Sequence, residues 1–130
     1  MYYTYILRCE DNSLYTGIAA DIKKRMSQHF RGAFGCAKYT RSRHPVFLEA
    51  VWESCDRSSA SKLEYRIKKL ARSDKQLLIR TNDMTALKNI DVLIYRRLTH
   101  DEIGGIRSWI QEKLLKNITD TTASVPDRKT

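Results

Sequence analysis

Five side chains in the first half of the chain combine residue types that can act together on a phosphate ester. In chain order they are Tyr5, Tyr15, Arg25, His29 and Glu64. Arginine presents a planar, permanently charged fork that suits a phosphate group, and tyrosine and histidine can exchange protons with a reacting oxygen. Carboxylate oxygens are ligands for hard divalent cations. Together, these types are suited to chemistry at a phosphate group, provided that the fold brings them together.

The two tyrosines fall on a predicted β-hairpin. Residues 2–8 and 14–18 are rich in aromatic and β-branched side chains and are separated by a polar turn, which is typical of paired strands. If Tyr5 pairs with Gly17, both tyrosines project from one face. Gly17 then marks a bulge or a close approach by another group. The alternative is that the tyrosines simply pack on a core, since the chain has seven of them.

Arg25 and His29 are four residues apart on a helix predicted to start after Asp21. This spacing places them on one helix face, about one turn apart. Arg25 can also be one more basic surface residue beside Lys23 and Lys24. His29 can be a helix C-terminal histidine that the helix dipole favours.

Glu64 lies on a second predicted helix, over residues 58–70. It stands three positions before Ile67, at the border of the apolar stripe, so its carboxylate needs a partner. Two other interpretations compete with a functional one. Ser61 and Glu64 fit a capping box, and Glu64 and Lys68 fit an i,i+4 ion pair.

These side chains must be positioned by a small α+β domain. The predicted order is β-β-α-β-α-α, with a three-stranded antiparallel sheet flanked by helices. Strands are predicted over 2–8, 14–18 and 46–53, and helices over 22–30, 58–70 and 73–80. A capping box at Ser73 opens the third helix, and a second one, Thr99 to Glu102, opens a C-terminal helix to about Lys116. Residues 90–95 fit a strand or a helix equally well.

The chain is expected to divide into three parts. Residues 1–82 form the domain that carries the candidate site, residues 83–116 form an extension that packs on or beside it, and residues 117–130 form a disordered tail. Residues 1–82 hold 16 Lys and Arg against 8 Asp and Glu, whereas residues 83–130 hold 8 against 7.

The basic residues are concentrated where acidic ones are absent. Between Asp21 and Glu49 there is no acidic residue, within a chain of formal net charge +9. Basic residues interleaved with aromatic ones favour contact with a phosphate backbone, although a solvated helix and loop would look similar. The expected nucleic-acid contacts are Gly17, Lys23, Lys24, Arg31, Lys38, Arg41 and Arg43.

The sequence also predicts a cytoplasmic protein without membrane contact. No apolar run approaches the roughly 18 residues of a membrane-spanning helix, and the start lacks the pattern of a secretory signal. The three cysteines, Cys9, Cys36 and Cys55, form no CxxC pair. We therefore expect reduced, ordinary thiols.

The motif residues resemble the GIY-YIG nuclease superfamily, in particular its small single-domain bacterial members. The resemblance covers about residues 2–80. It rests on the segments Tyr3-Thr4-Tyr5 and Leu14-Tyr15-Thr16-Gly17, followed by the two helices with Arg25, His29 and Glu64.

The resemblance assigns roles to these residues. It implies Tyr15 as general base with Tyr5 as its partner, and Arg25 as a clamp on the scissile phosphate. His29 would orient the water or donate a proton to the leaving oxygen, and Glu64 would hold Mg²⁺ or Mn²⁺.

The implied function is a metal-dependent DNA endonuclease in repair or recombination, structure-selective or weakly specific, with DNA favoured over RNA. Two departures favour an alternative, a catalytically weak or inactive nucleic-acid-binding module on the same fold. Ile18 stands where many relatives carry lysine, and Gln76 stands near the place of an asparagine in larger relatives. A third hypothesis is a protein adaptor that binds its partner through residues 83–116.

Overall fold

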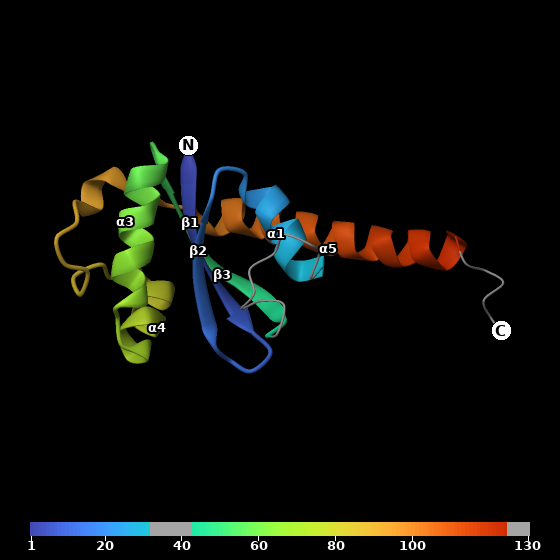
Figure 1. Ribbon diagram of the computed structural model, residues 1–130, viewed down its shortest axis with the longest axis horizontal. Coiled ribbons are helices and arrows are strands. Elements are labelled where there is room, and N and C mark those ends of the chain that lie inside the picture. The colour runs from blue at the N-terminus through green and yellow to red at the C-terminus, as the bar shows by residue number, and fades with distance from the viewer. Residues whose placement is uncertain (32–42, 125–130) are drawn as a thin grey trace.

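The computed structural model describes residues 1–31 and 43–124, with side chains described up to residue 116 (Figure 1). Its centre is an antiparallel sheet with the strand order β2-β1-β3-β4. The strands are β1 (Tyr2–Cys9), β2 (Leu14–Ala19), β3 (Pro45–Ser54) and β4 (Arg96–Arg97). The α+β class and the antiparallel sheet flanked by helices are confirmed.

The sheet has four strands where the sequence predicted three. The additional strand, β4, is only two residues long and pairs with Trp52 and Glu53 of β3. The following amide, of Leu98, donates to the carbonyl of Val51 over 2.9 Å. Because both residues of β4 are arginines, the sequence shows no apolar alternation there, and its pattern did not predict a strand.

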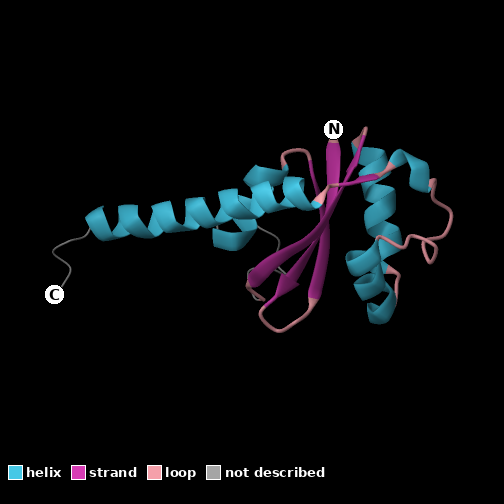
Figure 2. Cartoon of the chain, turned by 180° about the vertical axis from the view of Figure 1, so that it is seen from behind, coloured by secondary structure: helices cyan, strands magenta, loops and turns pink. Residues whose placement is uncertain are grey.

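Helices cover both faces of the sheet, as the front and back views show (Figures 1 and 2). One face packs against α1 (Ile22–Arg31) and α5 (His100–Ser124), and the other against α3 (Arg57–Lys68) and α4 (Arg72–Thr81). A short 3-10 turn, Val92–Ile94, precedes β4. Because β1 is central, Tyr5 and Leu7 belong to the first core whereas Ile6 belongs to the second.

The caps of α1 and α5 are those that the sequence predicted, whereas the cap of α3 was not predicted. The Asp21 carboxylate accepts from the Lys24 amide over 3.1 Å at the start of α1, and Asp56 caps α3. Thr99 and Glu102 form the predicted reciprocal capping box. The capping box predicted at Ser73 was wrong, because α4 begins one residue earlier and has no side-chain cap.

The C-terminal segment packs on the α1 face of the sheet. Ile103, Ile106 and Ile110 of α5 are buried in the first core. The Arg107 guanidinium donates two hydrogen bonds, of 2.9 and 2.7 Å, to the carbonyl of Leu48 in β3. These contacts tie α5 directly to the sheet.

Helix α5 does not end near residue 116. It continues to Ser124, so residues 117–124, predicted as part of a disordered tail, are helical. The physical reason is that no glycine or proline interrupts the chain between Gly105 and Pro126. Residues 125–130 of the predicted tail lie outside the described part of the chain.

Two further expectations concern membranes and thiols. Within the described residues, no helix combines the length and the apolar character that a bilayer crossing requires. Cys9 is buried and Cys55 is exposed, and both thiols are free. Cys36 lies outside the described residues.

Candidate active site

The hairpin register brings the two motif tyrosines onto one face. Tyr5 pairs with Gly17 and Leu7 pairs with Tyr15, as the sequence predicted conditionally. The ring centroids of Tyr5 and Tyr15 are 6.3 Å apart. Both rings also contact the imidazole of His29 on α1, with centroid distances of 5.5 Å. These four residues, Tyr5, Tyr15, Gly17 and His29, are called the hairpin cluster below.

Gly17 makes room for Tyr5. A Cβ atom added at Gly17 would lie 2.5 Å from the Tyr5 hydroxyl oxygen and 3.1 Å from a ring carbon of Tyr15. The close approach that the sequence predicted at this strand glycine is therefore present, and the approaching group is a tyrosine. Contact of Gly17 with a phosphate stays a prediction.

His29 is fully buried and reaches the site through Tyr5. Its Nε2 atom is hydrogen-bonded to the Tyr5 hydroxyl over 2.6 Å. Burial, with the nearby positive charge of Arg25, lowers the pKa of His29 to about 3. The imidazole is thus neutral at pH 7, so the favourable interaction of a charged histidine with the helix dipole does not apply. A direct contact between His29 and a reacting oxygen stays a prediction.

The two tyrosines differ in access. Tyr5 is only 1% exposed, and burial raises the pKa of its phenol, although a hydrogen bond from Arg25 works in the opposite direction. Tyr15 is half-buried on β2, the edge strand of the sheet. A ligand can therefore approach Tyr15 but not Tyr5.

Arg25, on α1, is a neighbour of the hairpin cluster. It is half-buried, and its Nη1 atom donates to the Oε1 atom of Gln28 over 2.9 Å. Its side chain also forms a hydrogen bond with the side chain of Tyr5. Arg25 and His29 thus both reach Tyr5 from one side of α1, as their four-residue spacing indicated.

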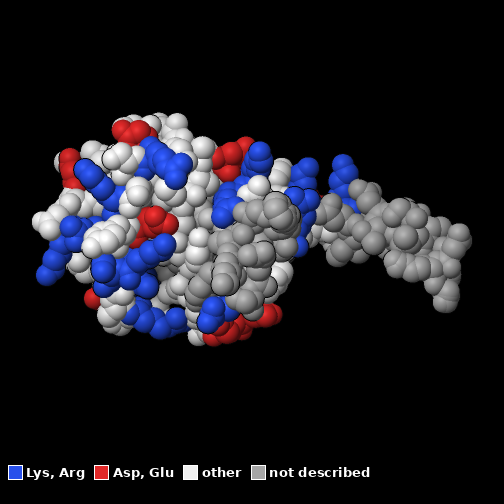
Figure 3. Space-filling view, viewed as in Figure 1, with Lys and Arg blue, Asp and Glu red and all other residues white. Residues whose placement is uncertain are grey.

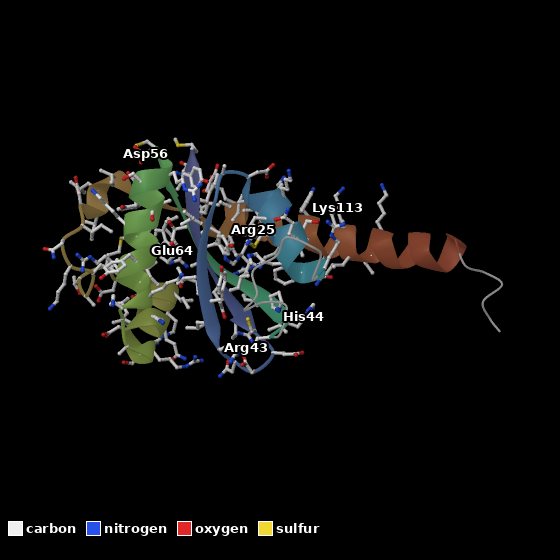
Figure 4. All side chains as sticks on the ribbon, in the orientation of Figure 1. Arg25, Arg43, His44, Asp56, Glu64 and Lys113 are labelled. Atoms are coloured by element: carbon white, nitrogen blue, oxygen red, sulfur yellow. The ribbon has the colours of Figure 1, made fainter. Side chains whose placement is uncertain are left out.

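Glu64 approaches the same strand from the other face of the sheet. Figure 4 shows Glu64 on α3 and Arg25 on α1 on opposite sides of β2. The Glu64 side chain is 22% exposed, and its Oε2 atom lies 3.3 Å from Nζ of Lys68. The ion pair that competed with a functional interpretation is therefore present. The capping-box alternative is wrong, because α3 starts after Asp56 and Ser61 lies inside the helix.

Lys68 is a neighbour of the site that the sequence analysis did not identify. Its Nζ atom lies 6.0 Å from the centroid of the Tyr15 ring. Its position four residues after Glu64 was the feature that could have identified it, but this spacing was interpreted only as an ion pair on the helix surface. Lys68 thus brings an ammonium group close to the Tyr15 ring.

The described residues supply only part of the ligand shell that a metal ion requires. Within the described residues, no group of three histidine, cysteine or acidic side chains is placed to bind a metal. Magnesium often takes one or two carboxylates and completes its shell with water and phosphate. Glu64 alone is therefore compatible with such an ion, provided that Lys68 gives way.

The expected phosphate contacts are only partly described. Lys23, Lys24 and Arg31 are exposed on α1. Arg43 forms an ion pair of 3.1 Å with Asp11. Lys38 and Arg41 lie outside the described residues. Figure 3 shows lysine and arginine side chains gathered over α1 and the adjoining part of α5.

The site thus consists of a tyrosine hairpin between a helix that bears Arg25 and a helix that bears Glu64. In the comparison with known proteins, a family model described as the GIY-YIG catalytic domain matches residues 1–77. The chain belongs to the GIY-YIG family, a family of nucleases.

Within this family the chain is similar to UPF0213 proteins. It is 46% identical to one from Desulfotalea psychrophila over 63% of this chain and 74% of the relative. It is 45% identical to one from Syntrophus aciditrophicus over 62% and 91%, respectively. A solution NMR structure of a UPF0213 protein from Bacillus halodurans covers 70% of this chain and 100% of that chain, with 36% identity and a TM-score of 0.41.

Proposed function

We propose that this protein is a metal-dependent endonuclease that hydrolyses phosphodiester bonds in DNA, with Tyr15 as the general base. The observation that carries the proposal is the arrangement around strand β2. A half-buried Tyr15 contacts His29 on one side and lies near Lys68, the ion-pair partner of Glu64, on the other. Membership of a nuclease family supports the reaction class.

Each side chain has a distinct task in this proposal. Tyr15 accepts the proton of the attacking water, and the ammonium group of Lys68 lies 6.0 Å from the centroid of its ring. Arg25 binds the scissile phosphate through its guanidinium fork. Tyr5 and His29 are positioning residues, because they are buried and hold the Tyr15 ring and the Arg25 side chain.

Glu64 would hold the divalent cation, Mg²⁺ or Mn²⁺. The cation supplies charge stabilisation for the phosphate as negative charge develops on it. Because Lys68 occupies a Glu64 oxygen at 3.3 Å, the cation and the ammonium group compete for the same carboxylate.

The substrate would be chosen by shape more than by sequence. Contacts to phosphates fix a protein on nucleic acid but carry no direct sequence information. The candidate contacts are lysine and arginine side chains on the same helix as Arg25. We therefore propose structure-selective or weakly specific cleavage of DNA, as in repair or recombination, in the cytoplasm.

Cleavage of nicked, flapped and single-stranded DNA by the full chain with Mg²⁺ or Mn²⁺ tests this proposal. Glu64→Gln should lower the cleavage rate roughly 100-fold or more, while binding measured in EDTA persists. Glu10→Gln removes an exposed carboxylate from the hairpin turn and should cut like the wild type. Equal residual cutting by the wild type and Glu64→Gln would indicate a contaminating nuclease and overturn the assignment.

One observation favours the alternative of a binding module without useful activity, namely that Glu64 is already paired with Lys68. Lys68→Gln separates the two possibilities. If Glu64 holds the metal, this variant should reach half-maximal cleavage at a lower Mg²⁺ concentration. If the wild type and Lys68→Gln both bind DNA but neither cuts with any divalent cation, the binding-module function replaces the nuclease.

A further inference from the structure

A second basic surface lies between α1 and α5, on the face of the sheet away from Glu64. It is an open groove of about 630 Å³. Five cationic side chains and one tryptophan line it, namely Lys23, Lys24, Arg31, Lys113, Lys116 and Trp109. We call these six residues the α1–α5 groove. In Figure 4, Lys113 projects from α5 close to α1.

Among the described residues that line the groove, five cations face a single carboxylate. Its single acidic lining residue, Asp21, accepts the Lys24 amide as the cap of α1. None of the ion pairs among the described residues includes a cation of the groove. By contrast, Arg96 is bound by both Glu53 and Glu102. Five cations around one groove create a strongly positive potential that attracts a polyanion.

Trp109 holds cations from both helices in place. The Nζ atom of Lys23 lies 5.9 Å from its ring centroid, and that of Lys113 lies 5.3 Å away. The ring itself is partly buried against the first core. An ammonium group over an aromatic ring is attracted to it, so Trp109 organises two ammonium groups that are 90 residues apart in the chain.

The groove and the candidate active site are connected across α1. Successive helical residues are rotated by about 100°, so Arg25 and Lys23 fall on opposite sides of α1, with Lys24 between them. Arg31, two turns after Lys24, extends this outer face. A chain of phosphates bound in the groove can therefore continue over α1 to Arg25.

We infer that α5 is part of the nucleic-acid-binding surface, and that the α1–α5 groove binds the phosphate backbone of the DNA that is cut at Tyr15. This inference rests on the proposed function for the identity of the polyanion. It assigns a role to a helix that lies beyond residue 77, where the family match ends. An anionic membrane is a poorer fit, because the apolar side chains Ile103, Ile106 and Ile110 of α5 are buried in the core.

Binding of a labelled flapped duplex to the full chain, measured in EDTA over a range of salt concentrations, tests the inference without requiring cleavage. Lys113→Gln/Lys116→Gln should weaken binding roughly tenfold and reduce the slope of log affinity against log salt by about 2. Arg80→Gln/Lys88→Gln removes two exposed cations elsewhere and should leave both quantities near wild type. Equal slopes for the two double variants would overturn the inference.

Tryptophan fluorescence gives a local readout. Of the two tryptophans in the chain, Trp52 is fully buried in the other core, and Trp109 lines the groove. A short thymidine oligonucleotide should quench the emission of the wild type but not of Trp109→Phe. Quenching that persists in Trp109→Phe would contradict binding in the groove. Because neither experiment involves cutting, a protein that binds as expected without cleaving overturns the proposed function and still supports the groove.

Discussion

The hairpin cluster and the α1–α5 groove share helix α1 but are built on opposite principles. The cluster is mostly buried and is held by short contacts, such as the 2.6 Å hydrogen bond between Tyr5 and His29. The groove is open and cationic, and two of its cations, Lys23 and Lys113, lie 5.9 and 5.3 Å from the centroid of the Trp109 ring. Catalysis requires positioned atoms, whereas attraction of a polyanion requires only density of charge. A conservative substitution should therefore damage the first region, and added salt should damage the function of the second.

The largest effect is expected from Tyr15→Phe, which removes one oxygen from the hairpin cluster. Loss of a general base typically lowers a rate by about 10² to 10⁴. The groove is untouched, so the affinity for DNA in EDTA and its salt dependence should remain those of the wild type. Single-turnover cleavage and equilibrium binding, measured side by side, check this separation of rate from affinity.

Tyr65→Phe provides the matched control, because Tyr65 is 55% exposed on α3 and lies outside the cluster. It should cut at the wild-type rate. If Tyr15→Phe also cuts at the wild-type rate while Tyr5→Phe does not, the base is the buried tyrosine, and the assignment based on accessibility is wrong.

The next effect concerns acid stability and follows from His29. Its pKa is about 3 in the folded protein, against about 6.5 in an unfolded chain. Between these values only the unfolded chain takes up the proton, so the free energy of unfolding should fall as pH falls, by about 1.4 kcal/mol per pH unit from this residue. Above pH 6.5 this contribution is constant.

Urea unfolding at several pH values between 7.5 and 4.5 measures this slope. His29→Gln keeps a polar partner for Tyr5 and removes the titrating group, so its slope should be shallower than that of the wild type. His100→Gln, at an exposed position, should retain the wild-type slope. Parallel curves for all three proteins would show that His29 takes up its proton in the folded state as readily as in the unfolded one.

The same comparison shows what the sequence could and could not predict. The tyrosine pair was predictable because strand alternation and a polar turn determine which side chains share a face. The partial burial of the Glu64 side chain was predictable from its place at the border of an apolar stripe. Strand β4 was not predictable, because its pairing with β3 depends on tertiary contacts. The groove was not predictable either, since Trp109 and Lys113 meet Lys23 only after both helices pack on the sheet.

A smaller effect is expected from Gly17→Ala, which alters the shape of the hairpin cluster without changing its charge. The new Cβ would lie 2.5 Å from the Tyr5 hydroxyl, and Tyr5 cannot move freely because it is buried and bonded to His29. We expect a loss of about 1 to 3 kcal/mol in the free energy of unfolding, together with slower cleavage. Urea unfolding and cleavage assays measure both. A cost that is undiminished in a Tyr5→Leu background would contradict this steric explanation.

The smallest effect is expected from the same type of substitution at a second glycine, Gly105→Ala in the first turns of α5. Nothing lies within 4 Å of a Cβ added there, so alanine should stabilise the helix by about 0.5 to 1 kcal/mol. Because Ile103 and Ile106 of α5 share a core with Tyr5, a single unfolding transition should shift upward by about 2 to 4 °C. Cleavage and salt dependence should not change. A separate transition for α5 would contradict the shared core. Residues 83–116 would then be a separate unit that only adds charge beside residues 1–82.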